Sequence, residues 1–139
     1  MFGYLIIRPN HDIELVESED EEFTLEEFHE KIDCEFIENV RICNPEVADP
    51  MERLFMVIDE EGKLTGKNAN FIASILYGAF DDVIMGTVVL GVLKEYPHPD
   101  IYKLPLERAR KLKEGLETLK QENIELFNKL DQYLEEDGR

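Results

Sequence analysis

The chain has 139 residues, of which 43% are hydrophobic and 34% are charged, and its formal net charge is -17. This length suits a single domain with a real core, and the apolar content excludes a fully disordered chain. The charge is regional: residues 1–60 hold 18 acidic and 4 basic side chains (18 − 4 = 14 negative charges), whereas the remaining residues hold 14 and 11. Such a field attracts basic protein surfaces and repels phosphate, so we expect a basic protein partner and no binding to nucleic acid or membrane.

The sequence carries no signal for export or membrane insertion. The N-terminal segment has no basic lead and too short an apolar run for a signal peptide. The longest apolar run, residues 83–93, is about half the ~20 residues that a membrane-spanning helix needs. Cys34 and Cys43 flank one predicted strand and lie too far apart to form a disulfide. Two free thiols are typical of a reducing compartment, and we expect a cytoplasmic protein.

The first predicted elements are a strand and a short helix. Residues 2–8 are rich in strand-forming side chains and end at Pro9 and Asn10, which predicts a core strand followed by a turn. Residues 12–22 are acidic and of mixed character, and no regular element is predicted there. Thr24 and Glu27 then match a capping box, and the apolar positions that follow predict an amphipathic helix ending near Asp33.

Two strands and a second short helix follow. Residues 36–42 alternate between apolar and polar side chains, as a half-buried strand does, and Asn44 with Pro45 ends them. Residues 54–58 are continuously apolar, which predicts a strand buried on both faces before a tight turn at residues 59–62. Asn70 is an N-cap candidate for a helix over residues 71–77, and Gly78 is its C-terminal stop.

The last predicted elements are a strand and a long helix. Residues 83–94 are rich in Val and Ile, and Gly86 and Gly91 mark a bulge or a close backbone approach within this strand. Residues 96–99 form a rigid connector, and from Pro105 to about residue 136 the pattern predicts one long helix. Together these elements predict an α+β fold. A compact domain of residues 1–100 would hold a small, mostly antiparallel sheet with one or two short helices, and residues 101–139 would hold the long C-terminal helix.

Apolar residues of the long helix recur with alternating steps of three and four, which is a heptad register. Ala109, Leu116, Asn123 and Leu130 take the a positions, and Leu112, Leu119, Leu126 and Tyr133 take the d positions. A lone Asn at an a position favours a parallel two-stranded coil, so this stripe is a candidate homodimer interface. A straight helix of this length spans about 48 Å, more than the roughly 33 Å diameter of a small domain, so part of it is expected to overhang. The alternative is that the stripe packs on the sheet as a core face.

No catalytic motif is recognisable in the sequence. A Gly-rich phosphate loop, a nucleophile elbow and a paired-cysteine spacing are all missing. His11, His29 and His98 stand far apart without ligand spacing, so each is interpreted as a surface or boundary residue and no metal is expected. Neighbouring carboxylates such as Asp81 and Asp82 arise from acid density alone. We therefore expect a protein without enzymatic activity and without a cofactor.

One stretch of the chain is similar to a known family. The segments DEEGKL at residues 59–64 and DVIMGT at residues 82–87, with Gly66 and Asn70 between them, resemble the domain-of-unknown-function family numbered 3846. With the opening strand, the resemblance covers residues 1–95. That family consists of short proteins of phages and conjugative elements in Firmicutes and related bacteria, which implies a mobile-element setting and supplies no established activity. Ala69 and Phe71 stand where the family has Pro and Arg, so no site built on that Arg is carried over.

Three functional hypotheses remain, and the first concerns the acidic run with the helix that follows it. The carboxylates are Glu17, Glu19, Asp20, Glu21, Glu22, Glu26, Glu27 and Glu30. The simplest interpretation is a solvated loop, and the sharper one is a surface that imitates nucleic-acid phosphate and binds, and so inhibits, a nucleic-acid-binding defence enzyme. The alternatives are a small-molecule binding module with a pocket at Asn70, Asp82 and Gly86, or a structural oligomerisation protein.

Overall fold

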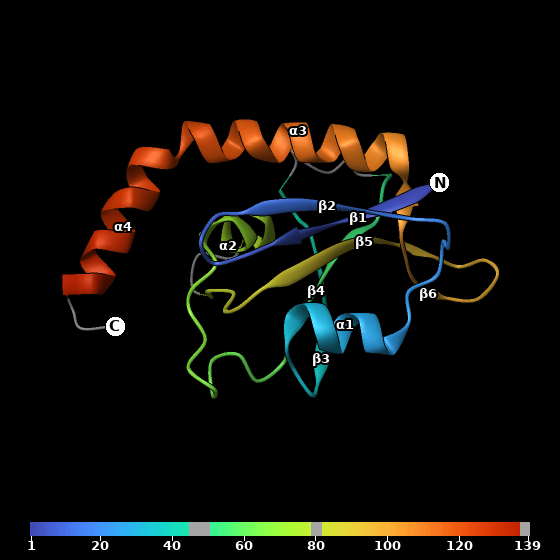
Figure 1. Cartoon of the computed structure of the whole chain (residues 1–139), viewed down its shortest axis with the longest axis horizontal. Helices are drawn as coiled ribbons and strands as arrows, with labels where there is room; N and C mark the ends of the chain where they lie inside the picture. Colours follow the sequence, from blue (N-terminus) through green and yellow to red (C-terminus); the bar gives the residue numbers. More distant parts are fainter. Residues whose placement is uncertain (45–50, 79–81, 137–139) are drawn as a thin grey trace.

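The computed structural model describes residues 1–44, 51–78 and 82–136, and within these residues one antiparallel sheet carries helices on both faces (Figure 1). Its strands are β1 (Phe2–Ile7), β2 (Ile13–Ser18), β3 (Ile37–Arg41), β4 (Leu54–Asp59), β5 (Val88–Lys94), β6 (Asp100–Tyr102) and β7 (Leu104–Pro105). The helices are α1 (Leu25–Ile32), α2 (Phe71–Tyr77), α3 (Leu106–Glu122) and α4 (Ile124–Glu136). The strand order is β2-β1-β5-β4-β3, with β6 paired to β5 and β7 paired to β1. The predicted α+β fold class is confirmed.

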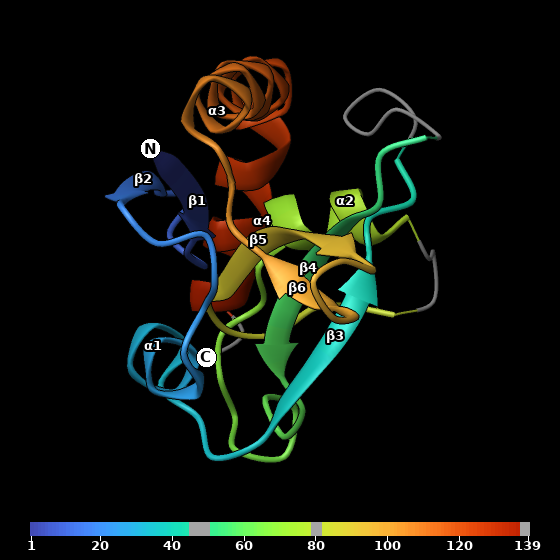
Figure 2. The same ribbon diagram turned by 90° about the vertical axis from the view of Figure 1, so that its right-hand side faces the viewer.

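Alternate residues of the central strands enter two hydrophobic cores, one on each face of the sheet. Leu5 and Ile7 pack in the core that α2 and α3 cover, whereas Tyr4 and Ile6 pack in the core that α1 covers. Figure 2 shows α1 and α3 on opposite sides of the sheet. Strand β4 contributes to both cores, which confirms the predicted strand that is buried on both faces.

Both short helices begin and end at the capping residues that the sequence predicts. Thr24 Oγ1 accepts a hydrogen bond from Glu27 N at 3.1 Å, and Glu27 Oε1 accepts one from Thr24 N at 3.0 Å, which completes the capping box of α1. Asn70 caps α2 through Ala73 N, and Gly78 ends it with a φ of 77°. These boundaries were predictable because each depends on contacts within a few residues.

Three strands lie where the sequence indicates none. Strand β2 falls inside the acidic stretch of residues 12–22, and the short β6 and β7 follow the connector of residues 96–99. Strand β2 pairs along its whole length with β1, from Ile13 opposite Ile7 to Ser18 opposite Phe2. The extended conformation of β2 is therefore determined by its pairing with β1. The acidic composition of the segment does not predict a strand.

The predicted strand over residues 83–94 is shorter than expected. Strand β5 begins only at Val88, because Gly86 has a φ of 88° and the chain turns there before it enters the sheet. Gly91 is the site of the predicted close approach: a Cβ at this position would lie 2.8 Å from the Tyr102 carbonyl oxygen on β6. The predicted loop around Pro45 and Pro50 lies outside the described residues, apart from Asn44 at its start.

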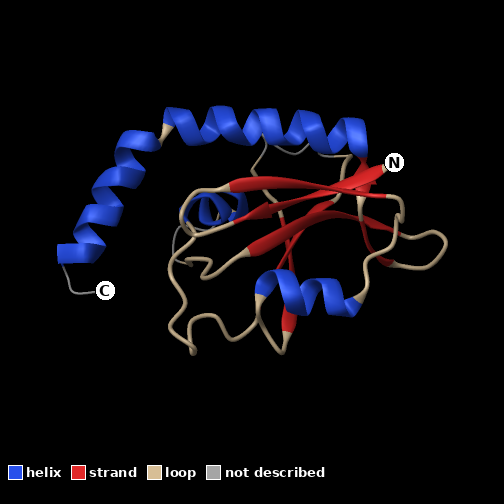
Figure 3. Ribbon diagram, viewed as in Figure 1, coloured by secondary structure: helices blue, strands red, loops and turns tan. Residues whose placement is uncertain are grey.

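The long C-terminal helix is present, but it bends at Asn123 into α3 and α4, as the break in Figure 3 shows. The Asn123 side-chain amide donates to the Leu119 carbonyl at 2.8 Å, and its backbone has a φ of -111° and a ψ of 8°. A short polar side chain competes here for a helical carbonyl and ends α3. The bend directs α4 down the side of the domain, where Phe127 packs beside Phe71 of α2 at 5.8 Å between ring centres, so the helix does not continue straight as expected.

The predicted dimer seam is wrong over its α3 half. Ala109, Leu112, Leu116 and Leu119 are all buried in the core of their own chain, so this stripe is the core face that formed the alternative prediction. Asn123, at the central a position, ends α3 instead of facing a second helix. Homodimerisation stays a prediction. Of the predicted interface residues, those that remain candidates are Leu126, Leu130 and Tyr133 of α4.

A pair of substitutions separates a core face from a dimer seam. Leu116→Ala removes a fully buried side chain and should lower the free energy of unfolding by about 2–5 kcal/mol. Leu126→Ala, which lies on the same heptad stripe but is 51% exposed, should lower it by less than about 1 kcal/mol. Urea unfolding measures both values. Equal losses for the two variants would show that the stripe is not a core face.

Candidate functional site

The acidic run is an ordered part of the fold, fixed by backbone contacts to the strands beside it. It begins in β2, and Glu22 then forms an isolated antiparallel bridge with Tyr102 of β6. Lys103 N donates to the Glu21 carbonyl at 2.8 Å. The carboxylates of this segment therefore occupy defined positions, which the solvated-loop interpretation did not anticipate.

A buried lysine organises the segment from beneath. Lys103 is 2% exposed, and its Nζ donates to Ser18 Oγ at 2.9 Å and forms an ion pair with Glu27 at 3.2 Å. The same Nζ lies 5.3 Å from the centre of the Phe23 ring and 5.7 Å from that of Tyr4, which are cation–π distances. Lys103 thus connects the end of β2 to the first turn of α1. Sequence reasoning missed it, although a single Lys between apolar Tyr102 and Leu104 was a usable signal.

Three of the eight predicted partner-binding carboxylates are paired with cations that lie far along the chain. Glu17 pairs with Arg110 of α3 at 3.2 Å, and Glu21 pairs with Lys94 of β5 at 2.6 Å. Glu27 pairs with Lys103 and also closes the capping box. We assign these three carboxylates to holding the segment in place, and their predicted role in contacting a partner stays a prediction.

The other five carboxylates point to solvent and form what we call the acidic surface: Glu19, Asp20, Glu22, Glu26 and Glu30. In the part of the chain that the structure describes, Glu30 comes within 3.9 Å of Lys31, and the other four form no ion pair. Glu26 and Glu30 are one helical turn apart on α1 and therefore lie on the same side of that helix. The fold fixes the positions of these charges and leaves them available to a partner.

The negative charge also acts on Tyr4, which lies beneath this segment. Burial of the phenol raises the pKa of Tyr4 to about 12, and the carboxylates of Glu27, Glu14 and Glu30 add to the shift. The unfolded chain has the ordinary value of 10.0. The folded state therefore holds the Tyr4 proton more tightly than the unfolded state, and the associated stability is present below pH 10 and lost as the pH rises towards 12.

Tyr4→Phe tests this assignment. The variant has no phenol to ionise, so the free energy of unfolding should fall less between about pH 8 and pH 11 than it does in the wild type, by about 1.4 kcal/mol. Urea unfolding over this pH range measures the difference, and deprotonation of lysines affects both proteins alike. Parallel pH curves would contradict a raised pKa at Tyr4.

Two of the three residues predicted to line a ligand pocket, Asn70 and Gly86, are in contact, but the contact is buried and lines no cavity that the described residues form. Asn70 is buried, and its amide donates to the carbonyls of Ile7 at 3.0 Å and Gly86 at 2.9 Å, so its role is structural. Asp82 pairs with Lys63. Only Gly86 borders a recess, of about 300 Å³, which it shares with Pro9, Asp33 and Lys67. The predicted pocket is therefore wrong in its composition.

His11 is not the surface or boundary residue that the sequence suggested. It is 7% exposed and stacks on Phe127 of α4 at 4.9 Å and on Phe71 of α2 at 5.6 Å between ring centres. Its Nε2 lies 2.8 Å from an Asp131 carboxylate oxygen, and its Nδ1 is buried without a partner. A proton on Nε2 fits this arrangement best, because a bare Nδ1 acceptor costs less to bury unpaired than an N–H donor. His11 thus attaches α4 to the turn between β1 and β2.

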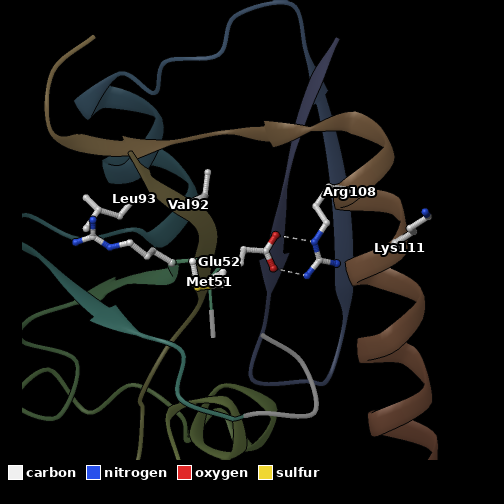
Figure 4. A pocket seen from close by; sticks show the side chains of 7 residues that line it. Met51, Glu52, Val92, Leu93, Arg108 and Lys111 are labelled. Atoms are coloured by element: carbon white, nitrogen blue, oxygen red, sulfur yellow. Dashed lines mark hydrogen bonds and ion pairs between the residues drawn. The ribbon is translucent and has the colours of Figure 1, made fainter. Parts of the chain in front are cut away.

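Basic side chains gather at the start of α3, beside an open hollow of about 680 Å³ (Figure 4). Arg108 is held there by Glu52 through two hydrogen bonds of 2.7 and 2.5 Å, and Lys111 lies one turn further along. The bidentate pair fixes the guanidinium and offsets its charge. This patch therefore offers a nucleic-acid phosphate only a partly neutralised site.

Both cysteines are free, and burial together with the Asp59 carboxylate raises the pKa of the Cys34 thiol, which disfavours the nucleophilic thiolate. The described residues contain no group of three or more His, Cys, Asp or Glu side chains placed to hold a metal ion. Among the helices described, none has both the length and the apolar character needed to cross a membrane.

Comparison with known proteins supplies no further assignment. No family model matches the chain, and searches of curated proteins and of solved structures give no match. The resemblance of residues 59–87 to the family numbered 3846 therefore stays a prediction, and the functional argument rests on the geometry of the described residues.

Proposed function

We propose that this chain is a non-enzymatic accessory protein of a phage or mobile element that acts in the cytoplasm by binding a basic protein. The acidic surface makes the contact, and the partner is a nucleic-acid-binding defence enzyme whose site it occupies. The observation that carries the proposal is the exposure of Glu19, Asp20, Glu22 and Glu26, without an ion pair among the described residues, on a segment held by Lys103. The mobile-element setting rests on the family resemblance alone.

The fixed position of these carboxylates favours binding over simple solubility. A flexible acidic loop would lose conformational entropy on meeting a partner, and that loss would offset much of the attraction between the charges. Here the bridge between Glu22 and Tyr102 and the contacts of Lys103 order the segment before any partner arrives. A row of exposed carboxylates also presents the charge that basic nucleic-acid sites use for affinity.

The test replaces four carboxylates by amides of the same shape and leaves the structural pairs intact. The substitutions of the test variant are Glu19→Gln, Asp20→Asn, Glu22→Gln and Glu26→Gln. A control variant changes four exposed helical carboxylates, Glu107→Gln, Glu114→Gln, Glu122→Gln and Glu125→Gln. Both variants have the same formal net charge (−17 + 4 = −13), so they separate the position of the charge from its amount.

Affinity capture from a bacterial lysate at low and high salt, with identification of the bound proteins, gives the readout. The wild type and the control variant should retain a basic partner in a salt-sensitive manner, and duplex DNA should displace it. The test variant should lose the partner, whereas single substitutions should each change binding by no more than about 1 kcal/mol. Equal capture by the test and control variants would refute the proposal, as would direct binding of the wild type to DNA in a mobility-shift assay.

A further inference from the structure

A further cleft lies between α4 and the loop before α2. Its walls are Pro9 and Asn10 of the turn between β1 and β2, residues 66–69 of the loop, Met85, and the α4 residues Asp131, Leu134 and Glu135. The volume of this half-open cleft is about 770 Å³, within the range of about 300–1,000 Å³ that is usual for small-molecule sites. The buried contacts of His11 and Phe127 hold α4 in the position that forms this wall.

Two carboxylates of α4 line this cleft. Asp131 and Glu135 are four residues apart on one helix, an arrangement in which like charges repel each other. The Asp131 oxygen Oδ2 accepts the hydrogen bond from His11. The described residues give its other oxygen no partner and give Glu135 no ion pair, so both carboxylates can accept hydrogen bonds from a ligand.

The lysine that lines the cleft does not neutralise them. Lys67 Nζ lies 2.8 Å from an Asp59 oxygen, and it donates to the carbonyls of Ile32 at 3.0 Å and Asp33 at 2.6 Å. These three acceptors take all three of its protons. The aliphatic part of Lys67 covers Gly86, where an added Cβ would lie 2.9 Å from the lysine Cδ. The acceptors of the Lys67 ammonium group are therefore residues that do not line this cleft.

We infer that this cleft binds a small organic cation, a primary ammonium group carried on an apolar body. The carboxylates of Asp131 and Glu135 receive the ammonium group, and the apolar body lies against Pro9, Met85 and Leu134. An anion is disfavoured by both carboxylates, and a neutral ligand leaves their mutual repulsion in place. The site is separate from the acidic surface and does not depend on the function proposed for that surface.

The test uses three probes of similar size that differ in charge: 2-phenylethylamine, its neutral counterpart 2-phenylethanol, and the anion 3-phenylpropanoate. Each is titrated into the full-length, ¹⁵N-labelled chain while backbone amide signals are followed by NMR. The amine should cause saturable shifts at Asn68, Ala69, Met85 and Leu134. It should bind about tenfold more tightly than the alcohol, the difference between a charge-assisted and a neutral hydrogen bond, and the anion should not bind.

Substitutions in α4 assign the selectivity. Glu135→Gln with Asp131→Asn should bring the affinity for the amine down to that for the alcohol, and the amide oxygen introduced by Asp131→Asn can still accept the hydrogen bond from His11. Glu125→Gln, an exposed change elsewhere on α4, should leave the amine affinity unchanged, and the amide spectra report directly whether each variant is folded. The inference is overturned if the alcohol binds as tightly as the amine, if the shifts fall on residues 19–26 instead of the cleft, or if the double variant keeps its preference for the amine.

Discussion

The buried ammonium group of Lys103 is the interaction on which the arrangement of the acidic segment depends. A charge removed from water is costly unless hydrogen bonds and an opposite charge surround it. Ser18 Oγ and the Glu27 carboxylate supply these partners, and the rings of Tyr4 and Phe23 cover the remaining side. Ser18 ends β2, and Glu27 lies in the first turn of α1. The hydrogen bond and the ion pair of Lys103 therefore hold both ends of the acidic run in place.

This arrangement divides the acidic residues between two tasks. Carboxylates that meet a cation of the fold, such as Glu21 with Lys94 and Glu17 with Arg110, hold the segment against the sheet and α3. Carboxylates between these anchors, such as Asp20 and Glu22, stay in water. A surface built in this way keeps a strong local field and does not need to become ordered when it meets a partner.

What the sequence could predict follows the range of the interactions involved. The ends of α1 and α2 depend on Thr24, Glu27 and Asn70, whose partners lie within a few residues, and these boundaries are correct. Strand β2 depends on pairing with β1, and its acidic composition conceals it. The heptad stripe correctly identifies the apolar residues of α3 that become buried. Periodicity alone, however, cannot distinguish a core face from a dimer seam.

The candidate site shows the same division between local and distant contacts. The exposed carboxylates of the acidic surface could be proposed from composition, because charge density is visible in the sequence. The roles of Lys103 and His11 could not, because their partners lie far along the chain: Lys103 contacts Ser18, and His11 contacts Asp131. Asp131 and Lys67 likewise line one cleft only because the helix bends at Asn123.

Backbone order in residues 19–24 is the most direct test of the claim that the acidic surface is preorganised. ¹⁵N relaxation of the wild-type chain in the absence of any partner measures it. We expect order parameters close to those of β1, about 0.85 as in rigid backbone. Values below about 0.6 in this segment, with β1 remaining rigid, would show a mobile acidic loop and would contradict the account.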